Sequence, residues 1–168
     1  NFVFIKASEG THFKDPKFKE NHAAAKSECI YRGAYHFYET GKNPKEQAKN
    51  FIAAVGELVP GDLPPALDLE ELGIKTSIDK DTYQKNTLLW LQIVEKELGV
   101  TPIIYSDPSF GNKYLDHPDF DNYQLWVAEY TKSSSPKVPE IWKNKGWLIW
   151  QRTDRKKLEG MNGNVDYD

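Results

Sequence analysis

Short apolar runs alternate with longer amphipathic segments along almost the whole chain, and this alternation limits the fold more than any other feature. The apolar runs have the length of strands, and they cover residues 1–6, 33–38, 64–70, 101–105, 123–128 and 146–151. Between them the periodicity predicts helices over residues 16–31, 44–58, 80–98 and 107–116. Strands that alternate with helices predict parallel pairing and right-handed crossover connections. The chain is therefore expected to be an α/β protein.

The second and third predicted helices carry clear end signals. Asn43 can cap the second helix, and Glu46 stands three residues later, where a capping box has its acid. Asp79 or Asp81 marks the start of the third helix, and Gly99 is suited to end it. These signals fix two of the helix starts more firmly than periodicity alone.

Two architectures fit the alternation: an open doubly wound sheet and a (β/α) barrel. A Gly-rich phosphate loop would favour the open sheet, and the sequence has neither GxGxxG nor GxxxxGK[ST]. Strands that end in polar and aromatic residues favour the barrel, whose active sites lie at the carboxyl ends of the strands. We expect an irregular TIM-like (β/α) barrel with a groove at those ends, formed by residues 1–168 as a single domain.

Composition argues against several classes of partner. The net charge is −3 and basic residues are scattered, so nucleic acid is not expected to bind. The densest basic cluster, Arg152 with Arg155, Lys156 and Lys157, is interpreted as a solvated loop. No apolar run is long enough to cross a bilayer. Cys29 is the only cysteine, which permits no internal disulfide, and we expect it to be a buried thiol on the first helix.

The sharpest signal for chemistry is the pair of acids that closes the third apolar run. Asp68 and Glu70 are two residues apart, so on a strand they point to the same side with Cα atoms roughly 6.5–7 Å apart. Two carboxylates at such a short distance raise one another's pKa. One acid held protonated beside one held ionised is what glycoside hydrolysis requires. The alternative is that one carboxylate caps the following loop and the other is solvated.

Other kinds of site find little support. The four histidines have no metal-ligand spacing with one another or with Cys29, so no metal is expected. His36 lies within an apolar strand and is expected to be a hydrogen-bonded core residue. The sequence also lacks the GxSxG motif of serine hydrolases.

Aromatic residues at the ends of the predicted strands form a second signal. Most are expected to be core, because aromatic side chains dominate core burial. A few at strand ends offer apolar faces on which sugar rings can stack. The candidates are Tyr35, Phe37, Tyr105 and Trp126, and Gln151 offers a polar contact to sugar hydroxyls.

Taken together, the sequence resembles glycoside hydrolase family 25, the Chalaropsis-type lysozymes, in seven segments that occur in order through the chain. One such segment is weak evidence, whereas seven in order with plausible spacing are strong evidence. The segments are Phe2–Gly10, Arg32–Tyr38, Pro65–Glu70, Pro102–Ser106, Leu125–Ala128, Ile149–Gln151 and Gly163–Asp166.

The resemblance implies a β/α barrel that hydrolyses the β-1,4 bond between N-acetylmuramic acid and N-acetylglucosamine in peptidoglycan. Glu70 matches the family's general acid. Asp68 matches the partner carboxylate, which either stabilises positive charge at the anomeric centre or orients the substrate's N-acetyl group. Asp166 matches a third acidic position in the groove. No cofactor is implied and a monomer is expected. The substrate implies action outside the cytoplasm, in the periplasm, in the extracellular space or at a target cell's wall.

The sequence departs from the family pattern at its start. The family opens with a strand that carries an aspartate and then a helix, and this chain begins at what would be the second strand. We therefore expect residues 1–168 to be a catalytic domain without that strand and helix. Two alternatives remain open: a peptidoglycan-binding protein that has lost catalysis, and a barrel hydrolase of another N-acetylated glycan such as chitin. The full chitinase signature DxxDxDxE is absent.

Overall fold

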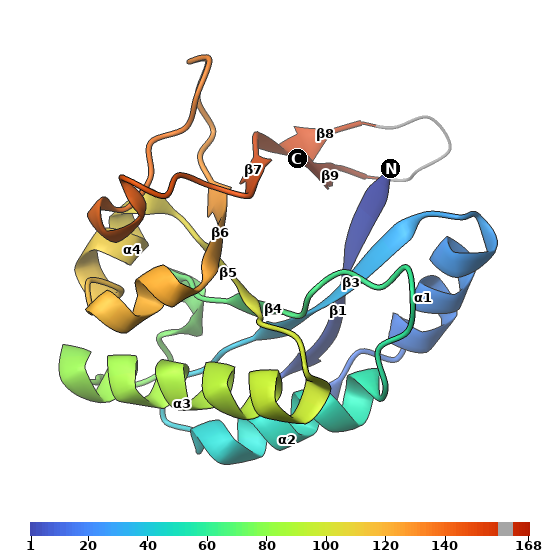
Figure 1. Ribbon diagram of the computed structural model, residues 1–168, viewed down its shortest axis with the longest axis horizontal. Coiled ribbons are helices and arrows are strands. Elements are labelled where there is room, and N and C mark those ends of the chain that lie inside the picture. The colour runs from blue at the N-terminus through green and yellow to red at the C-terminus, as the bar shows by residue number, and fades with distance from the viewer. Residues whose placement is uncertain (158–162) are drawn as a thin grey trace. The chain divides into compact units, whose positions relative to one another are not determined.

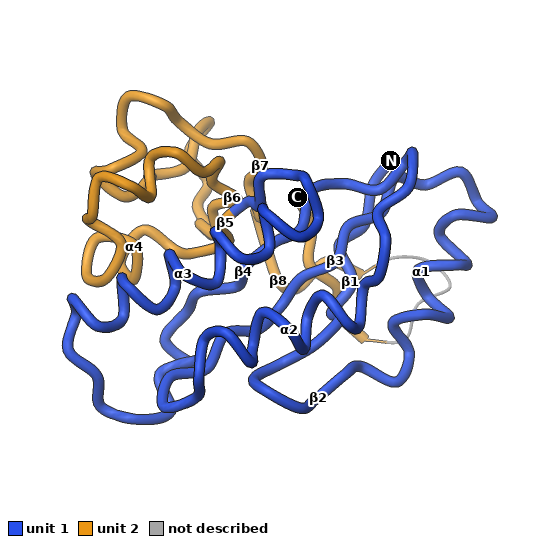
Figure 2. The backbone as a smooth tube through the Cα atoms, turned by 60° about the horizontal axis from the view of Figure 1, so that its bottom comes forward, with its two compact units in different colours: residues 1–103 blue, residues 104–168 orange. Residues whose placement is uncertain are grey.

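The structure, a computed structural model, describes residues 1–157 and 163–168. The chain divides into two compact units, residues 1–103 (unit 1) and residues 104–168 (unit 2), which are coloured separately in Figure 2. The single catalytic domain predicted for residues 1–168 stays a prediction. Among the described residues, no helix combines the length and the apolar character that crossing a membrane requires.

Unit 1 is a small sheet with helices packed against it. Its strands are β1 (Phe2–Glu9), β2 (Phe13–Lys14), β3 (Tyr31–Phe37) and β4 (Ala66–Asp68), and their order in the sheet is β2-β1-β3-β4. The pairs β1–β3 and β3–β4 are parallel, whereas β1–β2 is antiparallel. Its helices are α1 (Phe18–Ser27), α2 (Pro44–Val55), α3 (Lys80–Leu98) and the short 3-10 turn η1 (Glu71–Gly73).

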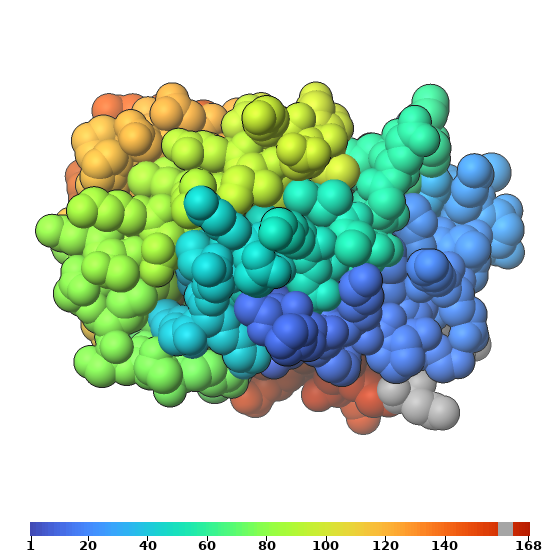
Figure 3. Space-filling view, turned by 90° about the horizontal axis from the view of Figure 1, so that it is seen from below, coloured from blue at the N-terminus to red at the C-terminus, as the bar shows by residue number. Residues whose placement is uncertain are grey.

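Helices α2 and α3 form the layer that covers one side of these strands (Figure 1). They pack side by side, and Figure 3 shows α2 in cyan next to α3 in green to yellow-green. The core between helices and strands is aromatic: the rings of Phe51 on α2 and Trp90 on α3 lie 5.3 Å apart, and both residues are fully buried. His36 of β3 joins them, with its ring 5.4 Å from that of Trp90.

Both helices begin at a side-chain cap, as predicted. The side chain of Asn43 accepts a hydrogen bond from Lys45 N at 2.9 Å, and that of Asp79 accepts one from Thr82 N at 2.9 Å. The capping box is wrong, because the Glu46 carboxylate bonds the Lys49 ammonium at 3.0 Å instead of returning to the start of the helix.

Unit 2 combines parallel strands with a separate hairpin. Strand β5 (Ile103–Ser106) begins at the boundary of the units and is followed in the sheet by β6 (Gln124–Ala128) and β7 (Ile149–Gln151), which pair in parallel. Strands β8 (Thr153–Lys156) and β9 (Val165–Tyr167) form an antiparallel pair. The remaining elements are α4 (Pro108–Tyr114), η2 (Pro118–Asn122) and η3 (Glu140–Trp142).

The mixed α/β class is confirmed, while closure into a barrel stays a prediction. Each predicted strand and helix overlaps one in the structure, with ends shifted by a few residues. Strands β2, β8 and β9 were not predicted. The basic cluster was also misinterpreted, because Arg155 and Lys156 lie in strand β8, although both side chains are exposed as expected.

The prediction for Cys29 is wrong: the residue is exposed, not buried. Helix α1 ends at Ser27, and Cys29 follows in a left-handed conformation with φ of 56°. Ile30 N then donates back to Ala25 O at 2.9 Å, which closes the helix end. A left-handed residue at this place turns the chain out of the helix, so Cys29 leaves the apolar side that helical periodicity assigned to it.

Candidate active site

The two predicted acids lie at the carboxyl end of β4. Asp68 is the last residue of the strand and is buried, and Glu70 is half-buried with an extended backbone, φ −145° and ψ 169°. Leu67 and Leu69 are fully buried. Because successive residues of an extended chain point to opposite sides, the leucines anchor one side and the two acids share the other.

Backbone hydrogen bonds hold this acidic pair in place. Tyr38 N donates to Asp68 O at 3.2 Å, and Gly73 N donates to Glu70 O at 3.0 Å. Gly73 O in turn accepts from Thr40 N at 2.9 Å. A Cβ atom at Gly73 would lie 2.3 Å from Tyr38 O, so only glycine permits this close approach. The turn after Glu70 is thus fastened to the end of β3.

The register of β3 and β4 brings two predicted aromatic residues to the acidic pair. Tyr35 pairs with Ala66, and Phe37 pairs with Asp68. Between them, His36 turns its ring toward Trp90 in the helix layer. Since residues alternate along a strand, Tyr35 and Phe37 point away from the helices. Asp68, as the register partner of Phe37, lies on the same side.

Positive charge gathers around the ring of Phe37. The ammonium of Lys6 lies 4.9 Å from the ring centroid, and that of Lys75 lies 5.7 Å from it. Lys6 also bonds Glu9 at 2.5 Å. Cations over an aromatic face are attracted by the ring quadrupole, so the residue beside Asp68 sits in a locally cationic setting.

His36 is a buried, hydrogen-bonded core residue, which confirms the sequence prediction. Its Nδ1 lies 2.8 Å from Ser8 Oγ and its Nε2 lies 3.3 Å from Gln47 Oε1. Burial lowers the pKa of His36 to about 3, and the hydrogen bond to Gln47 opposes that shift only in part. The imidazole is therefore neutral at ordinary pH, and it supports the strand rather than exchanging protons with a substrate.

The predicted residues of unit 2 contact one another directly. The rings of Tyr105 and Trp126 meet edge to face at a centroid distance of 4.9 Å. Tyr105 Oη donates to Gln151 Oε1 at 2.9 Å, and Tyr130 Oη donates to the same oxygen at 2.8 Å. Gln151 is only 2% exposed and Trp126 only 6%. The Gln151 side-chain oxygen therefore accepts hydrogen bonds from two tyrosines, and the polar contact of Gln151 to sugar stays a prediction.

Asp166 lies in β9, and a second acid, Asp168, follows two residues later. Asp168 was not among the predicted site residues. Burial, and then the charge of Asp154, raise the pKa of Asp166. Burial also raises the pKa of Asp168, against the hydrogen bond that its Oδ1 accepts from Trp126 Nε1 at 2.7 Å. Asp168 stands two residues after Asp166, and that spacing on a strand was the one available signal for it.

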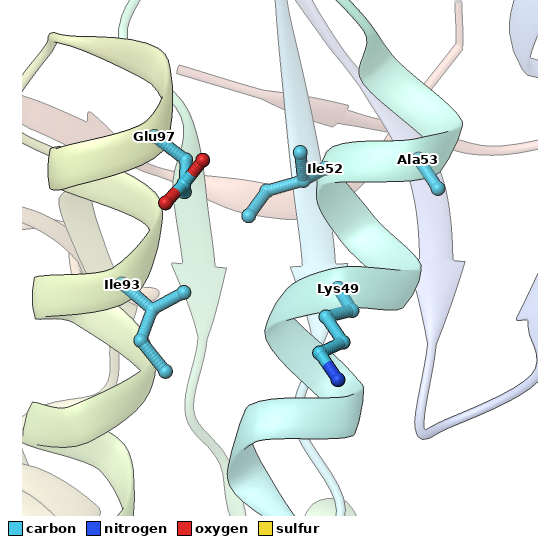
Figure 4. Close-up of a pocket in the computed structure, with 5 residues that line it drawn as sticks. All are labelled: Lys49, Ile52, Ala53, Ile93 and Glu97. Carbon is cyan, nitrogen blue, oxygen red and sulfur yellow. The ribbon is translucent and has the colours of Figure 1, made fainter.

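A groove of about 370 Å³ runs between α2 and α3 (Figure 4), and it contains none of the predicted site residues. Its lining is Lys49, Ile52, Ala53, Ile93 and Glu97. Within residues 1–157 and 163–168, no three acidic, histidine or cysteine side chains gather in a way that would hold a metal ion.

Comparison with known proteins decides the family. The model of glycosyl hydrolases family 25 matches residues 1–161, which is nearly the whole chain. The chain belongs to this family. The acidic pair and the strand-end aromatic residues described above are therefore features of a family 25 chain, and their roles can be considered in those terms.

Relatives of this family 25 chain include bacterial proteins with and without a described activity. Protein YegX of Escherichia coli K12, which is uncharacterised, is 36% identical over 99% of the chain and 58% of its own length. Lysozyme M1 of Streptomyces globisporus is 26% identical over 99% of the chain and 58% of its own length. The crystal structure of the bacterial lysozyme from Streptomyces coelicolor matches with a TM-score of 0.88 at 26% identity, covering 98% of this chain and 78% of that one. The chain thus spans somewhat over half the length of these curated relatives.

Proposed function

We propose that this family 25 chain is a muramidase that hydrolyses the β-1,4 bond between N-acetylmuramic acid and N-acetylglucosamine in peptidoglycan. The observation that carries the proposal is the acidic pair at the carboxyl end of β4. Asp68 is buried and Glu70 is partly open to solvent, so one strand end offers two carboxyl groups in unequal environments. Glycoside hydrolysis needs two carboxyl groups that differ in this way.

Glu70 is assigned as the general acid. It would donate its proton to the glycosidic oxygen as the bond from that oxygen to the anomeric carbon breaks, and water would then complete the hydrolysis. The half-exposed position of Glu70 suits this role, because the side chain is within reach of a substrate while its backbone is fastened through Gly73.

Asp68 is assigned as the partner carboxylate. In one form of the mechanism its negative charge stabilises the positive charge that develops at the anomeric carbon. In the other it orients the substrate's N-acetyl group, which then attacks that carbon from within the substrate. Burial of Asp68 favours a fixed carboxylate in either form, since a group held by its surroundings needs no reorganisation during the reaction.

The remaining predicted residues are proposed to contact the substrate. Asp166 is the proposed third acid, and Tyr35, Phe37, Tyr105, Trp126 and Gln151 are the proposed glycan-binding set. The (β/α) barrel, with its groove at the carboxyl ends of the strands, is the architecture we propose for the reaction. Peptidoglycan glycan strands are the proposed partner, so the protein would act outside the cytoplasm, in the periplasm, in the extracellular space or at a target cell's wall.

Analysis of the reaction products tests this function. Purified peptidoglycan is incubated with the chain, the soluble products are reduced with borohydride, and their ends are identified by mass spectrometry. A muramidase releases fragments whose reduced end is muramic acid. Reduced glucosamine ends would contradict the bond assignment. Peptidoglycan that is bound but not cut would indicate a binding protein, and cleavage of chitin alone would indicate a hydrolase of another glycan.

A further inference from the structure

Asp168 holds the indole of Trp126 from its edge. Its Oδ1 accepts the indole N–H at 2.7 Å, across 42 residues of sequence. The backbone before Asp168 is itself fixed, because Arg152 N donates to Tyr167 O at 2.8 Å and Thr153 pairs with Tyr167 in the β8–β9 hairpin. A hydrogen bond to a carboxylate is shorter and stronger than one between neutral groups, so this bond favours the observed orientation of the Trp126 indole.

Gln151 holds two tyrosines in a similar way, through their hydroxyl groups. Its single carbonyl oxygen accepts from Tyr105 and from Tyr130, and its own side chain is buried. Tyr130 is 56% exposed, and its hydroxyl is held by Gln151. The backbone beside it is fastened as well, since Glu129 N donates to Gln151 O and Glu129 O accepts from Trp150 Nε1.

These contacts join end to end. Asp168 holds Trp126, Trp126 packs edge to face on Tyr105, and Gln151 links Tyr105 to Tyr130. Neither Asp168 nor Gln151 presents an aromatic face, and the oxygen that each contributes already accepts an aromatic N–H or O–H. Both residues therefore influence a bound sugar through the rings that they hold.

We propose that Asp168 and Gln151 are positioning residues, which lock the aromatic set Tyr105, Trp126 and Tyr130 in the orientation that binds an N-acetylated glycan chain. This inference rests on the proposed function and adds to it the source of glycan affinity in unit 2. Rings that are ordered before binding lose little conformational entropy when a sugar stacks on them. Loss of either acceptor thus weakens binding more than it slows bond cleavage.

The first experiment follows Trp126 directly. The chain has five tryptophans, so labelling with 5-fluorotryptophan gives five ¹⁹F signals, and Trp126→Phe identifies the one of interest. Asp168→Ala removes the acceptor and is expected to shift or broaden that signal. Asp168→Asn keeps an amide oxygen as acceptor and is expected to restore it. Asp121→Ala, an exposed acid on η2 of the same unit, is the matched control.

Kinetics on soluble, uncross-linked peptidoglycan chains supply the second readout. Asp168→Ala is expected to raise KM by about tenfold and to change kcat by less than about twofold, with Asp168→Asn close to the wild type. Gln151→Leu is expected to raise KM similarly, and the same change made in the Tyr105→Phe, Tyr130→Phe double variant is expected to add nothing, because the donors are already gone.

The outcomes separate this inference from the proposed function. An unmoved Trp126 signal, or a KM that stays at the wild-type value in Asp168→Ala and Gln151→Leu, overturns the positioning role even if peptidoglycan is hydrolysed normally. A fully additive Gln151→Leu effect overturns the route through the tyrosines. A wild type that binds these chains without cutting them overturns the muramidase, and the same variants compared by dissociation constant then decide the positioning role.

Discussion

The two units place their proposed functional residues by different means. In unit 1 the acids at the end of β4 are held by backbone hydrogen bonds and by the buried Leu67 and Leu69. In unit 2 the aromatic residues are held by one another and by the side-chain oxygens of Gln151 and Asp168. We therefore expect that replacing Asp68 or Glu70 leaves neighbouring residues in place, whereas replacing Gln151 or Asp168 frees the aromatic rings that they hold. Loss of a carboxyl group from the acidic pair is expected to lower turnover, whereas loss of Gln151 or Asp168 is expected to weaken glycan binding.

Glu70→Gln is expected to have the largest effect. The amide keeps the shape of the side chain and loses the transferable proton, so turnover of peptidoglycan is expected to fall by about a thousandfold or more. Released fragments measured over time give the rate, and circular dichroism with thermal unfolding checks the fold. A variant that keeps near-normal turnover would remove Glu70 from the mechanism.

Asp68→Asn comes next, with an expected loss of about a hundredfold to a thousandfold in kcat. The change removes the negative charge and preserves the side-chain volume. The hydrogen bond from Tyr38 N is retained, because it goes to the main-chain oxygen of residue 68. Stability is therefore expected to change little. If the variant unfolds instead, Asp68 is a structural carboxylate. Replacing a side chain of the acidic pair would then disturb the fold of unit 1, contrary to the comparison drawn above.

Acid is expected to destabilise unit 1 through His36. The folded-state pKa is lowered to about 3, so the unfolded chain takes up the proton first, near pH 6.5. The stabilising contribution is complete above pH 6.5 and is lost as the pH falls toward 3, at up to about 1.4 kcal/mol for each pH unit. NMR of the folded protein is expected to show the His36 imidazole neutral at pH 5. Protonation of His36 near pH 6.5 would contradict the buried network.

Asn43→Ala tests whether a purely structural change in unit 1 spares the chemistry. Loss of the cap on α2 is expected to lower the free energy of unfolding by about 1 kcal/mol. Turnover at a temperature well below unfolding is expected to stay at the wild-type value, and Asn43→Asp, which keeps an acceptor, serves as the control. A parallel fall in kcat would mean that the helix layer tunes the acidic pair.

Asp166→Asn is expected to have the smallest effect on stability, opposite in sign to that of His36. Because burial raises the pKa of Asp166, the folded protein binds this proton more tightly than the unfolded chain does. Ionisation therefore costs stability as the pH rises through the folded-state pKa, and acid relieves the cost. Urea unfolding is expected to find the variant slightly more stable than the wild type at pH 7 and equal to it at pH 3. A less stable variant at pH 7 would show that the carboxylate is stabilising.

The sequence predicted the parts of the molecule that depend on local pattern. Alternating apolar runs predicted the α/β class, and the acids at residues 68 and 70 stood out because two-residue spacing has a simple meaning on a strand. The errors have non-local or conformational causes. Helical periodicity carried no sign that Cys29 turns left-handed. Asp168 was passed over because its partner, Trp126, lies 42 residues away, and only the folded chain brings the two together.

The separation of chemistry from affinity is tested most directly by a binding titration on inactive protein. Calorimetry with soluble peptidoglycan chains compares Glu70→Gln with Glu70→Gln that also carries Gln151→Leu. The first is expected to bind without releasing products, and the second to bind about tenfold more weakly with the same fold. Equal affinities would contradict the assignment of glycan binding to the aromatic set of unit 2. Loss of binding in folded Glu70→Gln alone would show that the acid of unit 1 supplies affinity as well as chemistry.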